Sequence, residues 1–349
     1  MGQRSGWRAG AAAVAVAALV GLVLWQGRRA EEAPAGLTLR GPTMGTTYTV
    51  KTGAGPAVDP EALQARITER LAEINRSMST WDPTSEISRL NAGRAVRGVP
   101  VSEDFQRVLA AALRLGKATG GAFDVTMGPL VNLWGFGPPE QGRFPTAAEV
   151  RAALARTGHG RVHLADGKVT LDVPGMYLDF SGIAKGYGVD AVAEVLRQAG
   201  FANYLVEIGG EVVAAGEPPE GGAWAVGVDR PEEGAVPGAG LEARILLRRG
   251  ALATSGSYRR FLAEGATRRH HIIDPRTGAP TDSPLVSVTV HAPDCMTADA
   301  VATALMVMGT AEGLAWVAGR PDIEALFIER TAAGDFRERA SAGFAALLE

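Results

Sequence analysis

The sequence predicts an α+β fold in which mixed and antiparallel sheets pack against helices. Helical and strand patterns are interspersed, but they lack the regular strand–helix–strand alternation of a parallel sheet. The chain has 349 residues, enough for a large core, and 45 glycines, which indicate many tight turns or close backbone approaches to a ligand. Neither a repeat nor a low-complexity linker follows residue 36. We therefore expect one domain over residues 37–349.

The N-terminal third of that domain begins with a strand and a helix. Residues 37–50 have strand character on both sides of a Gly/Pro interruption. Residues 59–78 predict an amphipathic helix, because apolar residues recur there at helical spacing: Leu63, Ile67, Leu71, Ile74 and Met78.

Capping and turn residues mark the next elements. Ser102 is expected to cap a helix that ends at Gly120–Gly121. Thr146 and Glu149 form a capping box for a second helix. Alternating apolar residues on both sides of Asp166–Gly167 predict a hairpin with a type I′ turn.

The C-terminal half mixes strands with apolar helices. Residues 177–200 pass from a strand through a glycine-rich loop into a helix. An apolar helix over 297–309, with Thr297 as a good N-cap, precedes another near 311–318. Further strands are expected near 203–208, 223–228, 243–248, 285–291 and 323–329.

Composition excludes some classes of protein. The net charge of −3 offers no basic field for nucleic acid. A single cysteine, Cys295, excludes an internal disulfide framework and a cysteine-based zinc site, and a buried free thiol is expected.

The N-terminus has the pattern of an export signal or a membrane anchor. Arg4 and Arg8 precede the uncharged stretch 9–25, and Arg28 and Arg29 follow it. Residues 1–36 are therefore expected to direct the protein across the cytoplasmic membrane, where it is either released or tethered.

The helix "TADAVATALMVMG" (297–309) contains a carboxylate in an apolar setting. Asp299 and Thr303 are four residues apart, so they share one helix face. One interpretation needs no ligand: an acid in the first turn of a helix complements the helix dipole, and this would explain Asp299. A magnesium site, which takes oxygen ligands, is the alternative.

The stretch "LDFSGIAKGYG" (178–188) has the features of a phosphate site. Asp179 precedes a turn in which Gly182 allows close backbone approach, and Lys185 enters the following helix. A helix N-terminus with a lysine suits phosphate, although a glycine-rich turn with a solvated lysine fits equally well.

Two further regions hold candidate residues. His271 precedes the turn signals of "IIDPRTG", near several arginines, and is a candidate general base. His159, His163 and His291 lack such neighbours in the sequence, and we assign them no role. Trp81 and Phe123 are candidates for stacking on a planar ring and Asp124 for accepting a hydrogen bond, with core packing as the alternative.

Together and in this order, these stretches resemble the ApbE family of FAD:protein FMN transferases. The resemblance covers roughly residues 37–330. It rests on eight motifs: "MGTTY", "STWDPTSEISRLN", "GAFDVTMGPLVNLWGFG", "LDFSGIAKGYGVD", "VEIGGEV", "TSGSYRR", "HIIDPRTGAP" and "ADAVATALMVMG".

The resemblance implies a T-fold-like architecture with helices packed around a central FAD cleft. It also implies transfer of the FMN half of FAD to a Thr or Ser of a target protein, with release of AMP. One magnesium ion would bind the backbone carbonyl of Gly182 with Asp299 and Thr303; Ala302 stands where some relatives carry a second acid. Contacts to FAD would come from Met44, Trp81, Ala122, Phe123, Asp124, Asp179, Lys185 and Ile273, with His271 as the base.

The resemblance further implies targets such as Nqr- or Rnf-type electron-transfer subunits, and a location at the outer face of the cytoplasmic membrane or in the periplasm. Two other functions stay open. One is a magnesium-dependent FAD pyrophosphatase, in which water replaces the target hydroxyl. The other is a non-catalytic flavin-binding protein.

Overall fold

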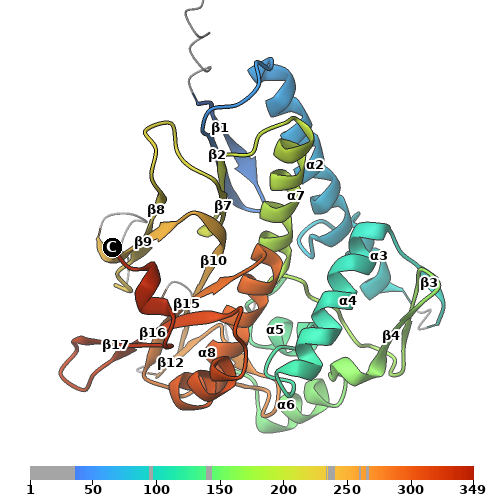
Figure 1. The fold of residues 1–349 in the computed structure, drawn as a ribbon. Coiled ribbons are helices and arrows are strands. Elements are labelled where there is room, and N and C mark those ends of the chain that lie inside the picture. The colour runs from blue at the N-terminus through green and yellow to red at the C-terminus, as the bar shows by residue number, and fades with distance from the viewer. Residues whose placement is uncertain are drawn as a thin grey trace, which may run out of the picture.

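The fold is α+β, as predicted, and its centre is an eight-stranded antiparallel sheet (Figure 1). The computed structural model describes residues 36–93, 97–138, 144–232, 234, 240–258, 261–264 and 267–349. In spatial order the strands are β1 (Thr38–Thr43), β2 (Thr46–Thr52), β6 (Tyr204–Ile208), β7 (Glu211–Ala215), β10 (Arg249–Gly256), β15 (Leu285–Ala292), β16 (Glu324–Arg330) and β17 (Phe336–Ala340).

Both faces of this sheet are covered by other elements. Successive side chains of a strand point to opposite faces, so neighbouring residues belong to different cores. Val206 and Val213 belong to the large core with three helices, α2 (Pro60–Met78), α7 (Ala184–Gln198) and α8 (Cys295–Ala318). Leu205 and Val212 belong to a second core, on the other face. There they meet the hairpin β8 (Trp224–Asp229)–β9 (Leu241–Leu247) and the turn η2 (Phe344–Leu347). Figure 1 shows α7 and the β8–β9 hairpin on opposite sides of the sheet.

Smaller elements surround this sandwich. The short sheet β3 (Val99–Pro100), β5 (Lys168–Leu171) and β4 (Val162–Ala165) lies beyond α3 (Glu86–Ala92) and α4 (Glu103–Ala118) in Figure 1. The remaining elements are α5 (Gly128–Leu133), α6 (Ala147–Leu154), η1 (His159–Arg161), and the pairs β11 (Phe261–Glu264)–β12 (Thr267–His270) and β13 (Ile273–Asp274)–β14 (Ala279–Pro280).

Local sequence signals predicted many of these elements correctly. Helix α2 begins after the N-cap Asp59 and buries its predicted apolar positions. Ser102 caps α4, and Thr146 with Glu149 forms the capping box of α6. The turn at Asp166–Gly167 has positive φ at both residues, 50° and 71°, as a type I′ turn requires.

Two expectations were wrong, the N-cap of α8 and a strand at Asp179. The N-cap of α8 is Asp294, not Thr297, whose N–H and hydroxyl both donate to the Asp294 carboxylate. The two helices predicted at 297–309 and 311–318, in contrast, are confirmed: they meet at Gly309, a kink with φ 76°. Residues 178–183 form no strand; Asp179 lies in a loop, and only Tyr177 makes an isolated bridge, to Met127.

The strand list was also incomplete. It lacked β7, β10 and β17 of the main sheet. These strands start beside glycines or carry charged residues, which weakens the apolar alternation on which the prediction relied.

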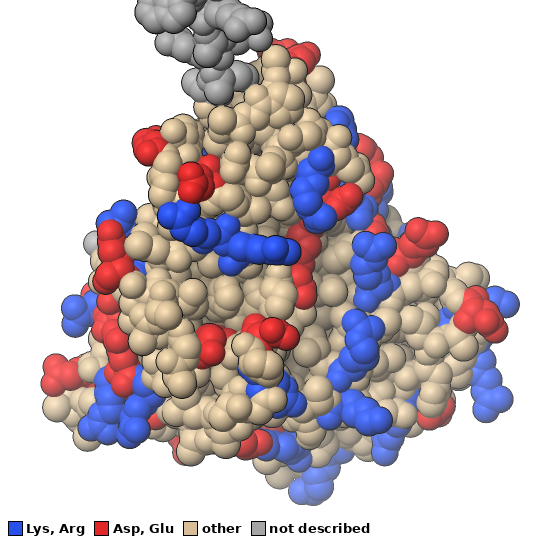
Figure 2. Space-filling view, in the orientation of Figure 1, with Lys and Arg blue, Asp and Glu red and all other residues tan. Residues whose placement is uncertain are grey.

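The predicted export segment, residues 1–36, lies outside the described residues except for Gly36, so this boundary stays a prediction. Among the described residues, α8 is long and apolar enough to span a membrane. It is the core helix of the fold, however, since both the main sheet and α7 pack on it. On the face in Figure 2, acidic and basic side chains are interspersed.

Candidate functional site

The candidate site lies where the N-terminal ends of α7 and α8 meet. Each helix caps the other: Asp299 Oδ2 on α8 accepts the Gly186 N–H of α7 at 3.0 Å. In return, the Asp190 carboxylate on α7 accepts the N–H groups of Cys295 and Met296 at 3.0 and 2.9 Å. A β-carbon on Gly186 would lie 2.2 Å from the Cys295 carbonyl oxygen, so only glycine permits this approach. Two helix N-termini are thereby fixed against each other.

This contact changes the interpretation of Asp299. The carboxylate is 3% exposed and lies in the second turn of its own helix, which has no acid in its first turn. The dipole of α8 therefore does not explain it. Asp299 instead points to the first turn of α7, where free N–H groups and a partial positive charge collect.

The three predicted metal ligands lie close together. A β-carbon on Gly182 would lie 3.2 Å from Thr303 Oγ1, so this loop touches the face of α8 that also carries Asp299. Thr303 Oγ1 is in turn 3.4 Å from Ser255 Oγ. Carbonyl, carboxylate and hydroxyl oxygens are hard donors and fit magnesium. In the described part of the chain no group of three or more His, Cys, Asp or Glu side chains could hold a metal ion. A metal site at this junction would therefore need hydroxyl and carbonyl oxygens as ligands in addition to the Asp299 carboxylate.

Lys185 forms an ion pair that the sequence did not predict. Its ammonium binds Oε1 of Glu211, whose side chain is only 4% exposed. Burial, together with the repulsion of Asp299, raises the pKa of Glu211 above its ordinary value, against the attraction of Lys185. Burial lowers the pKa of Lys185, but the two carboxylates outweigh it and raise the pKa above the ordinary value. The ammonium therefore stays charged.

Hydrogen bonds from two other segments hold the loop before α7, residues 178–183. The Asn91 side chain pairs with both the N–H and the carbonyl of Leu178, each at 2.8 Å. The Asp179 N–H donates to the Val125 carbonyl at 2.8 Å. Asp179 Oδ1 accepts the Ser181 N–H, and burial raises the pKa of this carboxyl. The "SRLN" and "AFDV" motifs thus position the glycine loop.

Ala122 and Phe123 are buried, and Phe123 lies against Gly182, within 3.4 Å of a β-carbon placed there. Asp124 holds the adjoining loops together: Oδ1 accepts the N–H and hydroxyl of Thr126, and Oδ2 accepts the His159 N–H. Burial raises the pKa of Asp124, but these bonds and the His159 ring outweigh it and keep the pKa below its usual range. Most acceptor capacity of this carboxylate is used inside the protein.

His159 and His163, to which the sequence assigned no role, both have acidic partners in the structure. His159 Nδ1 lies 3.5 Å from Asp124, whose negative charge raises the pKa of the ring. His163 pairs with Asp172 on the surface hairpin at 2.9 Å. Neither partner adjoins its histidine in the sequence, so only the tertiary structure reveals these pairs.

Met44 and Trp81 have features that core residues rarely show. Met44 occupies the β1–β2 turn with φ 49°, a left-handed conformation uncommon outside glycine, and its side chain packs on Gly188 of α7. Trp81, between α2 and α3, is 55% exposed. The exposed ring of Trp81 fits ligand contact better than core packing, and a left-handed turn residue such as Met44 is a feature common at ligand sites.

His271 and Ile273 lie beside α5. Ile273 pairs with Pro280 in the β13–β14 hairpin and is buried with Met127 and Leu130. The His271 ring meets the edge of Phe136 at a centroid distance of 6.2 Å. Trp134 Nε1 donates to the Gly278 carbonyl and ties this hairpin to α5. His271 thus lies next to a hairpin that is tied to α5.

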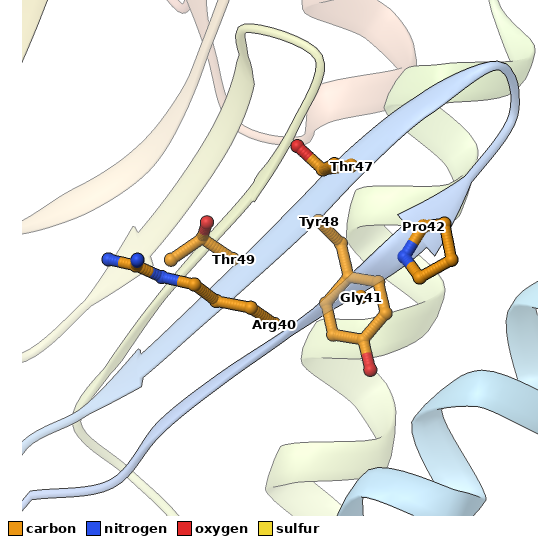
Figure 3. Close-up of a pocket in the computed structure, with 6 residues that line it drawn as sticks. All are labelled: Arg40, Gly41, Pro42, Thr47, Tyr48 and Thr49. Carbon is orange, nitrogen blue, oxygen red and sulfur yellow. The ribbon is translucent and has the colours of Figure 1, made fainter.

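An open hollow of about 410 Å³ lies on the β1–β2 hairpin (Figure 3). In the close-up Thr47 and Thr49 point to one side of the strand and Tyr48 to the other. The lining residues flank the Met44 turn, but none of them is a predicted site residue. The position of an FAD cleft therefore stays a prediction.

Comparison with known proteins bears on the family to which the chain is similar. Residues 44–327 match the sequence profile of the ApbE family. The FAD:protein FMN transferase of Vibrio cholerae is 43% identical over 308 residues, which cover 88% of this chain and 91% of that protein. That of Haemophilus influenzae is 41% identical over 324 residues, with 90% and 92% covered. Among solved structures, flavin transferase ApbE from Vibrio cholerae has a TM-score of 0.81 at 41% identity, covering 90% of this chain and 99% of that one.

Proposed function

Because the chain belongs to the ApbE family, we propose that it transfers the FMN half of FAD to a Thr or Ser hydroxyl of a target protein. The reaction depends on magnesium and releases AMP. The observation that carries this proposal is the junction of α7 and α8, which places a lysine beside the predicted oxygen ligands Gly182, Asp299 and Thr303.

The residues at this junction suit a pyrophosphate. Gly182, Asp299 and Thr303 would hold the magnesium ion, which when bound neutralises phosphate charge and polarises the bond to the leaving AMP. Lys185, with its permanent charge, binds a phosphate oxygen directly. Fixed positive groups of this kind stabilise the charge that develops in the transition state.

His271 is the proposed general base. It removes the proton from the target hydroxyl as that oxygen attacks phosphorus. The His271 ring contacts Phe136 and lies next to the β13–β14 hairpin. These contacts favour the role, because a general base acts only from a defined position. Ile273, two residues further, is proposed to line the bound FAD.

The remaining contacts to FAD are proposed at Met44, Trp81, Ala122, Phe123, Asp124 and Asp179. Trp81 has an exposed ring available for stacking. Asp124 is proposed to contribute mainly by holding its loop, since Thr126 and His159 occupy its oxygens.

The proposed setting is the outer face of the cytoplasmic membrane or the periplasm, reached through residues 1–36. Membrane electron-transfer subunits of the Nqr or Rnf type are the proposed targets. The arginines and the uncharged stretch of the N-terminal segment support this placement.

A single incubation tests the function. The protein is mixed with FAD, magnesium and a candidate acceptor domain, and both the acceptor mass and free AMP are followed. An acceptor heavier by one FMN, with one AMP per transfer, is expected. AMP with free FMN would indicate a pyrophosphatase instead, and neither product would indicate a flavin-binding protein. Omission of magnesium, with EDTA present, serves as the control for metal dependence.

A further inference from the structure

A buried carboxylate outside the predicted site, Glu211, lies directly against Lys185. It is the first residue of β7, immediately after the Gly209–Gly210 turn from β6, whose φ angles are 59° and 103°. A β-carbon on Gly209 would come 2.9 Å from the Thr46 side chain, so the turn packs closely on β2. The backbone that carries Glu211 is therefore rigidly placed.

The charge of Glu211 has one partner in the described part of the chain. Oε1 accepts from the Lys185 ammonium, whereas Oε2 is buried without a hydrogen-bond partner there. An ionised carboxylate is costly to remove from water unless it is paired. Stability alone would favour an apolar residue at this strand position. The presence of an acid at this position therefore calls for a role that involves Lys185.

Lys185 is held on one side and open on the other. Its ammonium has three N–H donors, of which Glu211 takes one. The lysine side chain is 32% exposed, so the ammonium reaches the edge of the core rather than its centre. A lysine stem is flexible and loses rotamer freedom whenever it binds a ligand. An ion pair formed beforehand removes that loss from the binding step.

We propose that Glu211 is a positioning residue, which anchors the Lys185 ammonium in the direction from which it meets the phosphates of FAD. This rests on the proposed function, because it takes FAD as the ligand. Glu211 itself does not touch the phosphates, which its negative charge would repel. It acts through Lys185.

A double-mutant cycle tests this route of action. FAD affinity is measured by calorimetry in magnesium without an acceptor, and kcat and KM by AMP release with one. Glu211→Gln keeps the size of the side chain but frees Lys185, and we expect FAD affinity to fall about 10-fold or more. In the Lys185→Met background the same change should alter affinity by less than about 2-fold.

Further variants separate positioning from folding. Glu211→Asp keeps the charge on a shorter stem and should recover part of the lost affinity. Glu207→Gln removes a carboxylate from the same hairpin, one that accepts the Gly210 N–H, and serves as the matched control with near wild-type affinity. Lys185→Met leaves Glu211 buried without its partner, so the double variant should melt at a higher temperature than Lys185→Met alone.

Two results would overturn the proposal: wild-type FAD affinity in Glu211→Gln, or an equal loss of affinity in both backgrounds. The second would mark Glu211 as merely structural. Failure of the wild-type protein to modify any acceptor would contradict the proposed function. The double-mutant cycle of FAD affinity would still test the role of Glu211, because that measurement needs no acceptor.

Discussion

Replacement of Gly186 by alanine tests whether the close contact between α7 and α8 builds the site. The added β-carbon would lie 2.2 Å from the Cys295 carbonyl oxygen and 2.8 Å from the Met296 Cα. Carbon–oxygen contacts normally begin near about 3.3 Å, so the overlap is about 1 Å. Both neighbours are backbone atoms at a helix start and have no rotamer to change.

Two effects of opposite sign meet at this position. Alanine in place of a helical glycine stabilises by about 1 kcal/mol through propensity alone. Overpacking costs about 1–3 kcal/mol, and we take the upper end because the clash is with backbone. The net loss is about 2 kcal/mol, which corresponds to a fall in melting temperature of about 4–8 °C in a large domain.

The assay is thermal unfolding followed by circular dichroism, together with calorimetry of FAD in magnesium. Gly160→Ala is the matched control, since a β-carbon there meets nothing within 4 Å. Gly186→Ala should also weaken FAD binding, because separation of the helices breaks the Gly186–Asp299 hydrogen bond. A melting temperature equal to or above that of the wild type would refute the reasoning, since propensity would then outweigh the contact.

Three other predictions concern single side chains. Asp299→Ala should abolish metal-dependent transfer, because it removes the one charged ligand proposed for magnesium; unchanged magnesium affinity in the FAD complex, measured by calorimetry, would contradict this. His271→Ala should lower the transfer rate by about 10²–10⁴-fold while FAD still binds; a near-normal rate would exclude His271 as the base. Burial raises the pKa of Asp190 to about 7, so the folded state binds a proton that the unfolded state has lost between about pH 4 and pH 7. The stability of the wild type relative to Asp190→Asn should therefore fall as pH rises through this range in chemical denaturation, and a flat difference would contradict the assignment.

Local patterns predicted the elements that local physics controls. A capping box acts within one helical turn, and a type I′ turn depends on two adjacent residues, so Thr146, Glu149 and Asp166–Gly167 were assigned correctly. The same is true of Asp299 and Thr303, which share a face of α8 through helical periodicity. The N-cap of α8 was misplaced because Asp294 and Thr297 are both good caps, and the sequence pattern did not separate them.

The order of the motifs, by itself, identified the family and predicted a list of candidate site residues. The tertiary structure decided what those residues contact. Asp299 reaches Gly186 across 113 residues of sequence, Glu211 reaches Lys185 across 26, and Asp124 reaches the His159 N–H across 35. Periodicity and capping rules act over a few residues and say nothing about such pairs. They form because folding buries these carboxylates, and each must then find a partner.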